Sequence, residues 1–271
     1  GRPAWPERSG RPAWPERSGP PLAVHVKVDS GMHRVGAAPD EAVQVASAVH
    51  ERPELRLEGL WTHFAVADDP DPSFTVEQCA RFEAVVARLA AAGIRPPLLH
   101  ACNSAGAIAH ARARHDLVRC GLALYGVPPA PALAGHVALR PVLSLRARVS
   151  YVKSVGAGEG ISYGLRHRFA GDAVVATVPI GYADGVPWRL GVNGGEVLIR
   201  GRRRPIAGAV TMDQITVDCG DDHAVAPGDE VVLIGSQGDE AVDAWEWAGR
   251  AGTIAYEILC GIGPRVPRIH L

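Results

Sequence analysis

Residues 23–36 read AVHVKVDSGMHRVG, and the alternation at the start of this segment indicates a β-strand over Ala23–Asp29. Successive side chains of a strand point to opposite faces, so the valines share one face and His25, Lys27 and Asp29 share the other. Strands of a (β/α)₈ barrel are buried on both faces, and their carboxyl ends carry the polar groups of the site. The segment predicts a barrel strand that brings ionisable groups to a site; an edge strand with one solvated face is the alternative.

Helical and apolar segments alternate downstream of this strand at the spacing of βα units. The pattern predicts helices over Pro39–His50 and Phe74–Ala92. Short apolar runs, each a candidate strand, recur at Leu57–Phe64, Pro97–Cys102 and Leu117–Tyr125. With the first strand they predict four βα units, which is half of a (β/α)₈ barrel, over residues 22–138.

From about Pro141 the helical period disappears, and short β-rich runs separated by Gly and Asp turns take over. One helix is expected near Val242–Gly249. The chain is therefore predicted to be α/β followed by all-β, with a mainly β C-terminal domain over residues 139–271. The expected strands lie in the runs Leu143–Val155, Asp172–Pro179, Glu196–Arg200, Pro205–Val217 and Glu230–Ile234.

Composition excludes several classes of protein. The 28 Lys and Arg residues balance 29 Asp and Glu residues, so no charge excess points to nucleic acid or an anionic membrane. No apolar run reaches the roughly 20 residues that a bilayer span needs. Five scattered cysteines without a CxxC pair argue against a disulfide framework or a metal site, and favour a reducing, cytoplasmic location. The repeat GRPAWPERS, at 1–9 and 10–18, predicts a disordered leader over residues 1–21.

Eight segments, in order along residues 22–271, carry a resemblance to one enzyme family. The first, VKVDSGMHRVG at Val26–Gly36, is similar to the signature V-K-(V/L)-D-(T/S)-G-M-G-R-(L/V)-G of the alanine racemases, which use pyridoxal 5′-phosphate (PLP). His33 departs from this signature, because Gly is usual there; Cys120 and Ala255 stand where Pro and Asn are common. The other segments are THFAVAD (62–68), HACNSAGAI (100–108), RCGLALYG (119–126), SYG (162–164), VPIGYADGVP (178–187), GAVTMDQ (208–214) and TIAYEILCGIGPRVPR (253–268).

The resemblance implies a role for each matching residue. Tyr182 would be the base that removes the Cα proton of L-alanine, and Arg34 and Met212 would bind the substrate. Tyr182 and Met212 would reach the active site of a partner subunit, which implies a homodimer with shared active sites. The residues expected at the cofactor are His63 beside the ring, Arg119 at the pyridine nitrogen, and Asn103, Ser104, Gly121, Leu122 and Tyr256 at the phosphate. A supporting network is expected from Lys27, His100 and Asp213.

The chemistry of these residue types agrees with such roles. The guanidinium of Arg119 is always protonated, so it donates a hydrogen bond and cannot protonate the ring, which leaves the ring a weak electron sink. The turn at Asn103 and Ser104 opens a helix whose amides suit a phosphate, although Ser104 also reads as a plain N-cap. Tyr182 needs nearby cations to release its proton at neutral pH. Family members also carbamylate the lysine equivalent to Lys27, which would turn it into an anion beside Arg34.

One part of the racemase pattern is absent from these 271 residues. The family's Schiff-base lysine occurs in the context K-A-(N/D)-A-Y-G-H-G, and neither Lys27 nor Lys153 has it. We therefore expect an alanine racemase, which supplies D-alanine for peptidoglycan, present here as an inactive fragment. A non-catalytic dimerising remnant and a related PLP barrel acting on another amino acid, such as a serine racemase or an amino-acid decarboxylase, are the alternatives.

Overall fold

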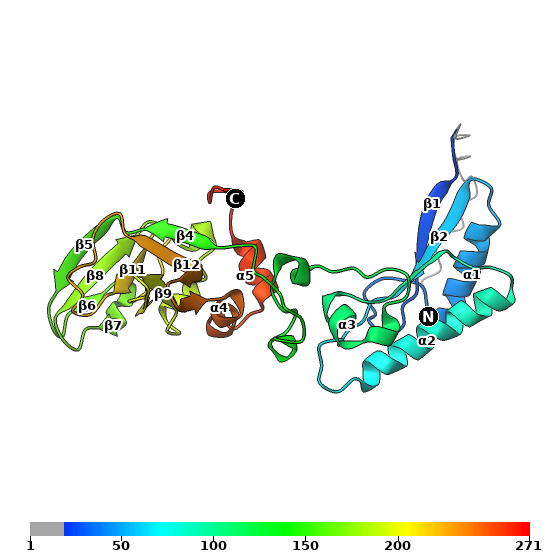
Figure 1. Ribbon diagram of the computed structural model, residues 1–271, viewed down its shortest axis with the longest axis horizontal. Helices are drawn as coiled ribbons and strands as arrows, with labels where there is room; N and C mark the ends of the chain where they lie inside the picture. Colours follow the sequence, from blue (N-terminus) through cyan, green and yellow to red (C-terminus); the bar gives the residue numbers. More distant parts are fainter. Residues whose placement is uncertain (1–18) are drawn as a thin grey trace, which may run out of the picture. The chain divides into compact units, whose positions relative to one another are not determined.

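The computed structural model of this chain describes residues 19–271. The leader predicted over residues 1–21 therefore lies, up to Ser18, outside the described residues. The chain divides into two compact units, with Cys120 ending the first and Gly121 beginning the second, and each is described by itself (Figure 1). None of the helices in the described range has the length and hydropathy of a transmembrane span.

The first unit is built on a parallel sheet with the strand order β1–β2–β3. Figure 1 labels β1 and β2, which lie side by side. Helix α1 connects β1 to β2, and α2 connects β2 to β3, which is the crossover that parallel pairing requires. A third helix, α3, follows β3 directly. The bounds are β1 (Leu22–Lys27), α1 (Pro39–His50), β2 (Leu55–Trp61), α2 (Ser73–Ala91), β3 (Leu98–His100) and α3 (Ser104–Ala109).

A small apolar core joins the helices to one face of this sheet. Val26 and Val28 are buried in it, whereas His25 and Lys27 point away from it, as the alternation in the sequence predicts. Helix α1 contributes two alanines, and α2 contributes an apolar stripe at helical spacing. The buried members are Val26, Val28, Ala42, Ala46, Leu57, Leu60, Phe82, Val85, Leu89 and Ile94.

The prediction of a fourth barrel strand over Leu117–Tyr125 is wrong. The chain here makes two backbone hydrogen bonds to residues of β3 and the turn after it. Asp116, just before the predicted strand, donates to Leu99 O, and Arg119 donates to Cys102 O. The chain then coils into a 3₁₀ turn over Leu122–Tyr125 that ends at the left-handed Gly126 (φ 73°). Within this turn the Leu124 N–H donates to Gly121 O at 2.9 Å, so this amide is not available for pairing with a strand. The first unit therefore contains three strands in its described part, and barrel closure stays a prediction.

The second unit is mainly β, in agreement with the prediction for this half of the chain. β12 lies at the centre of one sheet, between β9, β13 and β4, with β10 beyond β9; a second sheet has the order β11–β8–β5, and β6 pairs with β7. The strands are β4 (Leu145–Arg148), β5 (Tyr151–Val155), β6 (Gly160–Ile161), β7 (His167–Arg168), β8 (Ala173–Val178), β9 (Glu196–Ile199), β10 (Arg202–Pro205), β11 (Ile215–Asp218), β12 (Glu230–Gln237) and β13 (Glu240–Val242).

Three details of this half differ from the prediction. The run Leu143–Val155 forms two strands, because the chain leaves one sheet and enters the other between β4 and β5. Most of the run Pro205–Val217 is a loop rather than a strand. The first part of this loop, Ile206–Val210, is buried and contains a left-handed turn at Gly208 (φ 79°), whereas Met212–Gln214 are exposed. Besides the expected helix α4 (Ala244–Ala251), a second helix, α5 (Ala255–Gly261), follows it.

Candidate active site

Arg119 is the centre of a polar cluster in the first unit. Its Nη1 lies 2.5 Å from Nδ1 of His100, and its Nη2 lies 3.1 Å from Nδ1 of His63. Nη2 also donates to the carbonyls of Thr62 and Ala101, at 2.8 and 3.0 Å. These partners stand at or just beyond the carboxyl ends of β2 and β3, so two parallel strands deliver them to one edge of the sheet. The structure thus brings together Arg119, His63 and His100, as predicted.

Trp61, which the sequence analysis did not single out, packs against this cluster. The Arg119 guanidinium lies 4.7 Å from the centre of its ring, and the His100 ring stacks on it at 5.6 Å. The ammonium of Lys27 also lies 4.7 Å from the ring centre. One indole therefore contacts both cations through its negative π-face, an arrangement that holds them near each other without a carboxylate.

Burial and positive charge keep the two histidines neutral. Desolvation and then the charge of Arg119 lower the pKa of His63 to about 4, with further contributions from Arg34 and Lys27. The same two leading causes, burial and Arg119, lower the pKa of His100 to about 4. Neutral imidazoles can accept hydrogen bonds from the guanidinium, whereas imidazolium ions could not. The site therefore presents one fixed positive charge between two neutral rings.

Lys27 is an unusual lysine. Its Nζ is buried and has no hydrogen-bond partner among the described residues. Burial, followed by the charges of Arg34 and Arg119, lowers its pKa below the ordinary value despite the opposing effect of Asp29. The predicted proximity of Lys27 and Arg34 is thus present as an electrostatic interaction.

The loop after β1 places Arg34 through a strained turn. His33 has a left-handed backbone (φ 57°), at the position where the family signature has Gly. The Asp29 carboxylate holds this turn by accepting from the N–H groups of His33 (2.9 Å) and Gly31 (3.2 Å). Burial raises the pKa of Asp29, but these hydrogen bonds outweigh it and hold the pKa below its ordinary value.

At the outer end of the cluster, His25 continues the hydrogen-bonded chain. Its Nδ1 lies 2.9 Å from Nε2 of His100. In the β1–β2 ladder His25 is the partner of Gly59, after a register shift between Val24 and His25. The ring occupies the space above this glycine, since a Cβ on Gly59 would lie 2.2 Å from the His25 Nδ1.

The predicted phosphate segment forms the start of α3. Asn103 is the N-cap of this helix, and its Oδ1 accepts from the Gly106 N–H at 2.9 Å. Ser104 follows as the first helical residue and is buried. Gly106 allows α3 to approach closely, because a Cβ there would lie 3.0 Å from the Phe64 ring. Asn103 and Ser104 therefore begin a helix directly beyond β3, the strand that ends at His100.

The second unit holds the other predicted residues, and it brings Tyr182 and Met212 together. The backbone N–H of Tyr182 donates to Thr211 O at 3.0 Å, and that of Ala183 donates to Met212 O at 3.0 Å. Gly181 makes this contact feasible, since a Cβ there would lie 2.3 Å from Thr211 O. The side chains of Tyr182 and Met212 are about half exposed, at 47% and 53%.

Asp213 belongs to the same corner. Arg265 donates to Asp213 Oδ1 at 2.7 Å, and its Nε lies 3.1 Å from Asp184 Oδ1. Asp184 in turn accepts from the Gly181 N–H at 2.9 Å. Asp213 is therefore tied through Arg265 to the turn that carries Tyr182.

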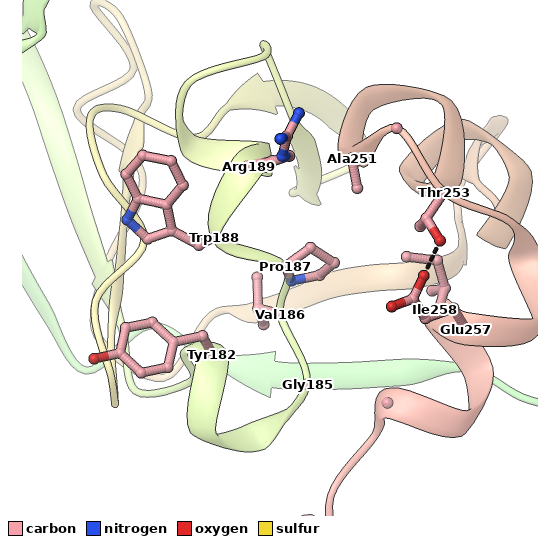
Figure 2. A pocket seen from close by; sticks show the side chains of 12 residues that line it. Tyr182, Gly185, Val186, Pro187, Trp188, Arg189, Ala251, Thr253, Glu257 and Ile258 are labelled. Atoms are coloured by element: carbon pink, nitrogen blue, oxygen red, sulfur yellow. Dashed lines mark hydrogen bonds between the residues drawn. The ribbon is translucent and has the colours of Figure 1, made fainter.

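A cavity of about 660 Å³ lies beside this turn. Tyr182, Trp188, Arg189, Thr253 and Glu257 line it, and Figure 2 shows the Tyr182 hydroxyl directed away from Val186 and Pro187. Glu257 accepts a hydrogen bond from the Thr253 hydroxyl (Figure 2). Of the remaining predicted residues, Tyr256 lies in α5 next to Glu257, while Gly121 and Leu122 begin the second unit.

Family models match almost the entire described chain. The model described as "Alanine racemase, N-terminal domain" matches residues 12–129, and "Alanine racemase, C-terminal domain" matches residues 142–270. The alanine racemase of Symbiobacterium thermophilum is 50% identical over 247 residues, which are 91% of this chain and 65% of that protein. The alanine racemase of Carboxydothermus hydrogenoformans is 44% identical over 251 residues, 92% of this chain and 68% of that protein.

Solved structures agree with these matches. The crystal structure of alanine racemase from D-cycloserine-producing Streptomyces lavendulae superimposes with a TM-score of 0.87 and 39% identity, covering 93% of this chain and 66% of that one. The alanine racemase of Streptomyces coelicolor gives a TM-score of 0.86 and 40% identity, covering 92% and 66%. The chain thus spans about two thirds of the length of these relatives. By sequence and fold, it belongs to the alanine racemase family.

Proposed function

We propose that this chain forms the larger part of a PLP-dependent alanine racemase, which interconverts L-alanine and D-alanine in the cytoplasm and supplies D-alanine for peptidoglycan. One observation carries the proposal: a guanidinium, fixed by two carbonyls and two neutral imidazoles, at the carboxyl ends of parallel strands. Such strand ends are where ligand sites of βα folds are built.

The donor set at Arg119 fits the pyridine nitrogen of PLP. That nitrogen accepts hydrogen bonds, and Arg119 offers N–H donors while being unable to give up a proton. When bound, PLP withdraws electrons from the substrate Cα and so makes its proton removable. Arg119 limits this withdrawal, which favours simple return of a proton over side reactions. His63 would lie against the ring, and Asn103, Ser104, Gly121, Leu122 and Tyr256 would hold the phosphate.

Proton transfer is assigned to the phenol of Tyr182. It would take the Cα proton of L-alanine, while the backbone of Met212 and the guanidinium of Arg34 bind the substrate. Asp213, through Arg265, would keep the Tyr182 turn in place. The half-exposed Tyr182 and Met212 side chains suit a homodimer in which each subunit completes its partner's site.

Lys27 and Arg34 would act together at the carboxylate of the substrate. A buried amine with a lowered pKa and no hydrogen-bond partner among the described residues is suited to carbamylation, since a neutral amine is the form that reacts with carbon dioxide. The carbamate would be an anion beside Arg34 and would hold it toward the substrate carboxylate.

The domain limits proposed for this function are residues 22–138 for the barrel part and 139–271 for the β domain. The gap between the two family matches, residues 130–141, supports a boundary there. Residues 121–138 nonetheless pack with the second unit, for example through the Trp245 Nε1–H that donates to Pro128 O at 2.8 Å.

A labelling experiment tests whether this chain of 271 residues can bind PLP covalently and interconvert alanine without any further residues. Neither lysine stands in the family's Schiff-base context: Lys27 packs on Trp61, and Lys153 lies in β5 of the other unit. After incubation with PLP and reduction with borohydride, mass spectrometry should find no stoichiometric pyridoxyl group on either lysine. Stoichiometric labelling together with interconversion of alanine would show that the chain is active by itself.

The role of Tyr182 is tested in a hybrid that joins residues 22–271 to the N-terminal part of the Symbiobacterium thermophilum enzyme. Tyr182→Phe keeps the packing of the ring and removes its only acid–base atom. Exchange of the Cα proton of L-alanine should fall by about 100-fold or more, while exchange from D-alanine falls much less. Tyr151→Phe, on the exposed face of β5, is the control. An equal fall for both enantiomers, or for neither, contradicts the assignment.

A further inference from the structure

Gln78 is a buried polar residue on the apolar stripe of α2. Its side chain is fully buried (0% exposed), and it shares the stripe with Phe82, Val85 and Leu89 at helical spacing. A primary amide carries two acceptor sites and two N–H donors, which are costly to bury without partners. Three hydrogen bonds satisfy this amide, and all of them leave the helix for the loops that follow β1 and β2.

Two of these bonds bracket a single residue of the loop after β2. Gln78 Oε1 accepts from the Ala65 N–H at 2.9 Å, and Nε2 donates to the His63 carbonyl at 3.1 Å. The backbone groups between them belong to Phe64, whose side chain is buried against Gly106. An N–H can only donate and a carbonyl can only accept, so the partners determine which way the amide points. The single side chain of Gln78 therefore holds the backbone of residues 63–65, which carries His63.

The third bond starts a directed chain toward the loop after β1. Gln78 Nε2 donates to Ser30 Oγ at 3.2 Å, and Ser30 Oγ lies 2.6 Å from Thr62 Oγ1. Thr62 Oγ1 donates to Val28 O at 2.9 Å, so the Ser30 hydroxyl must be the donor to Thr62. Gln78, Ser30 and Thr62 are each essentially buried. The same Thr62 offers its carbonyl to Arg119 at 2.8 Å.

We infer that Gln78 is a positioning residue for His63: its amide holds the backbone on both sides of Phe64 and thereby keeps the His63 imidazole against Arg119. The significance for catalysis rests on the proposed PLP site, but the mechanical role does not. Gln78 acts on His63 through the backbone of residues 63 and 65 and does not touch the reacting atoms. Its position also explains why a polar residue occupies an apolar stripe.

Thr75 provides a matched control on the same helix. It is also fully buried, but its Oγ1 has no hydrogen-bond partner among the described residues. Thr75→Val therefore removes a buried polar atom from α2 without breaking a bond to either loop. Gln78→Met keeps the length of the side chain and removes all three bonds.

The test follows the two imidazoles by NMR in the 271-residue chain without cofactor. In the unchanged chain, His63 and His100 should both titrate near pH 4. In Gln78→Met the His63 midpoint should rise toward 6.5, by about one pH unit or more, because the ring leaves Arg119 and meets water. His100, which Gln78 does not contact, should stay near 4, and Thr75→Val should change neither. His63→Gln and His100→Gln identify the two signals.

Gln78→Leu keeps the measurement informative if Gln78→Met does not fold. Leucine suits the apolar stripe of α2 and can neither accept from Ala65 nor donate to His63 O or Ser30, so the same selective rise is expected. An unchanged His63 midpoint, an equal rise at His100, or the same rise in Thr75→Val overturns the inference. Because no cofactor is present, failure of the PLP proposal would leave this result unaffected, and the reverse also holds.

Discussion

The guanidinium of Arg119 donates to Nδ1 of His100 across 2.5 Å, a hydrogen bond in which the imidazole can only be the acceptor. His100 must therefore be neutral with its proton on Nε2. That proton points to Nδ1 of His25, 2.9 Å away, so the polarity of the chain runs outward from Arg119. Protonation of His100 at Nδ1 would place two donors face to face.

This arrangement predicts a loss of stability in acid. Because the pKa of His100 is about 4 in the folded chain and near 6.5 when unfolded, the unfolded chain takes up a proton first as the pH falls. The free energy of unfolding should fall between pH 6.5 and 4, by up to about 3 kcal/mol from His100. His100→Gln offers Arg119 an acceptor and His25 a donor without titrating, so its stability should fall less over this window.

Urea denaturation at pH 7, 5.5 and 4 measures this difference. The exposed His50 at the end of α1 supplies the control, and His50→Gln should retain the pH dependence of the unchanged chain. If His100→Gln and His50→Gln lose stability equally between pH 6.5 and 4, then His100 is not the group that titrates.

The left-handed turn at His33 predicts a difference between two substitutions. Both His33→Gly and His33→Ala remove the exposed contact with Asp29, so they differ only in backbone preference. Glycine adopts φ near 57° freely, whereas the Cβ of alanine opposes it. His33→Gly should be more stable than His33→Ala by about 1 kcal/mol in urea denaturation. Equal stabilities would show that the turn relaxes when the histidine is removed.

In the second unit, Arg203 of β10 links three other elements, β9, β13 and α4, by ion pairs. Arg203 contacts the carboxylates of Glu196 (3.1 Å), Glu240 (3.0 Å) and Glu246 (2.7 Å), which raises its pKa, chiefly through Glu246. Arg203→Met removes the cation that the three carboxylates share and leaves Glu196 with its longer ion pair to Arg250, at 3.8 Å. Because these side chains are partly exposed and solvent screens their charges, we expect a loss of about 1–2 kcal/mol in the free energy of unfolding.

Arg200 is the matched control for this prediction. Among the described residues its one ion pair is with Asp229, at 3.7 Å, and its side chain is half exposed. Arg200→Met should cost about 0.5 kcal/mol or less. Similar losses of unfolding free energy in the two variants would mean that the ion pairs of Arg203 stabilise the fold no more than the exposed ion pair of Arg200 does.

Local patterns in the sequence predicted most elements, and the errors have physical causes. The predicted limits of α1 agree with the structure, and those of α2 differ by one residue at each end, because helical periodicity and end signals are local. The apolar run at Leu117–Tyr125 looks like a strand, but pairing depends on a neighbour that the run itself does not encode. The apolar stretch Ile206–Val210, within the strand predicted over Pro205–Val217, is likewise buried although it belongs to a loop.

The candidate site was predictable only where a motif marked it. Arg119, His63 and His100 lie together as the resemblance implied: the two histidines stand at the carboxyl ends of β2 and β3, and Arg119 reaches them from the segment after α3. Gln78 has no motif, and its only signal is a polar residue on an apolar helical stripe, which does not say what it contacts. Trp61 likewise acts through cations that come from β1 and from beyond β3, so its role appears only in three dimensions.

The packing of His25 on Gly59 has a consequence for how these sequences can diverge. Any side chain at position 59 would collide with the His25 imidazole, so the order in which the two positions change matters. A lineage must first replace His25 by a smaller residue, and only then can Gly59 acquire a side chain. Relatives should therefore fall into two groups, those with glycine at 59 and those with a small residue at 25. Relatives with a bulky residue at both positions should be rare, because the two side chains would occupy the same space.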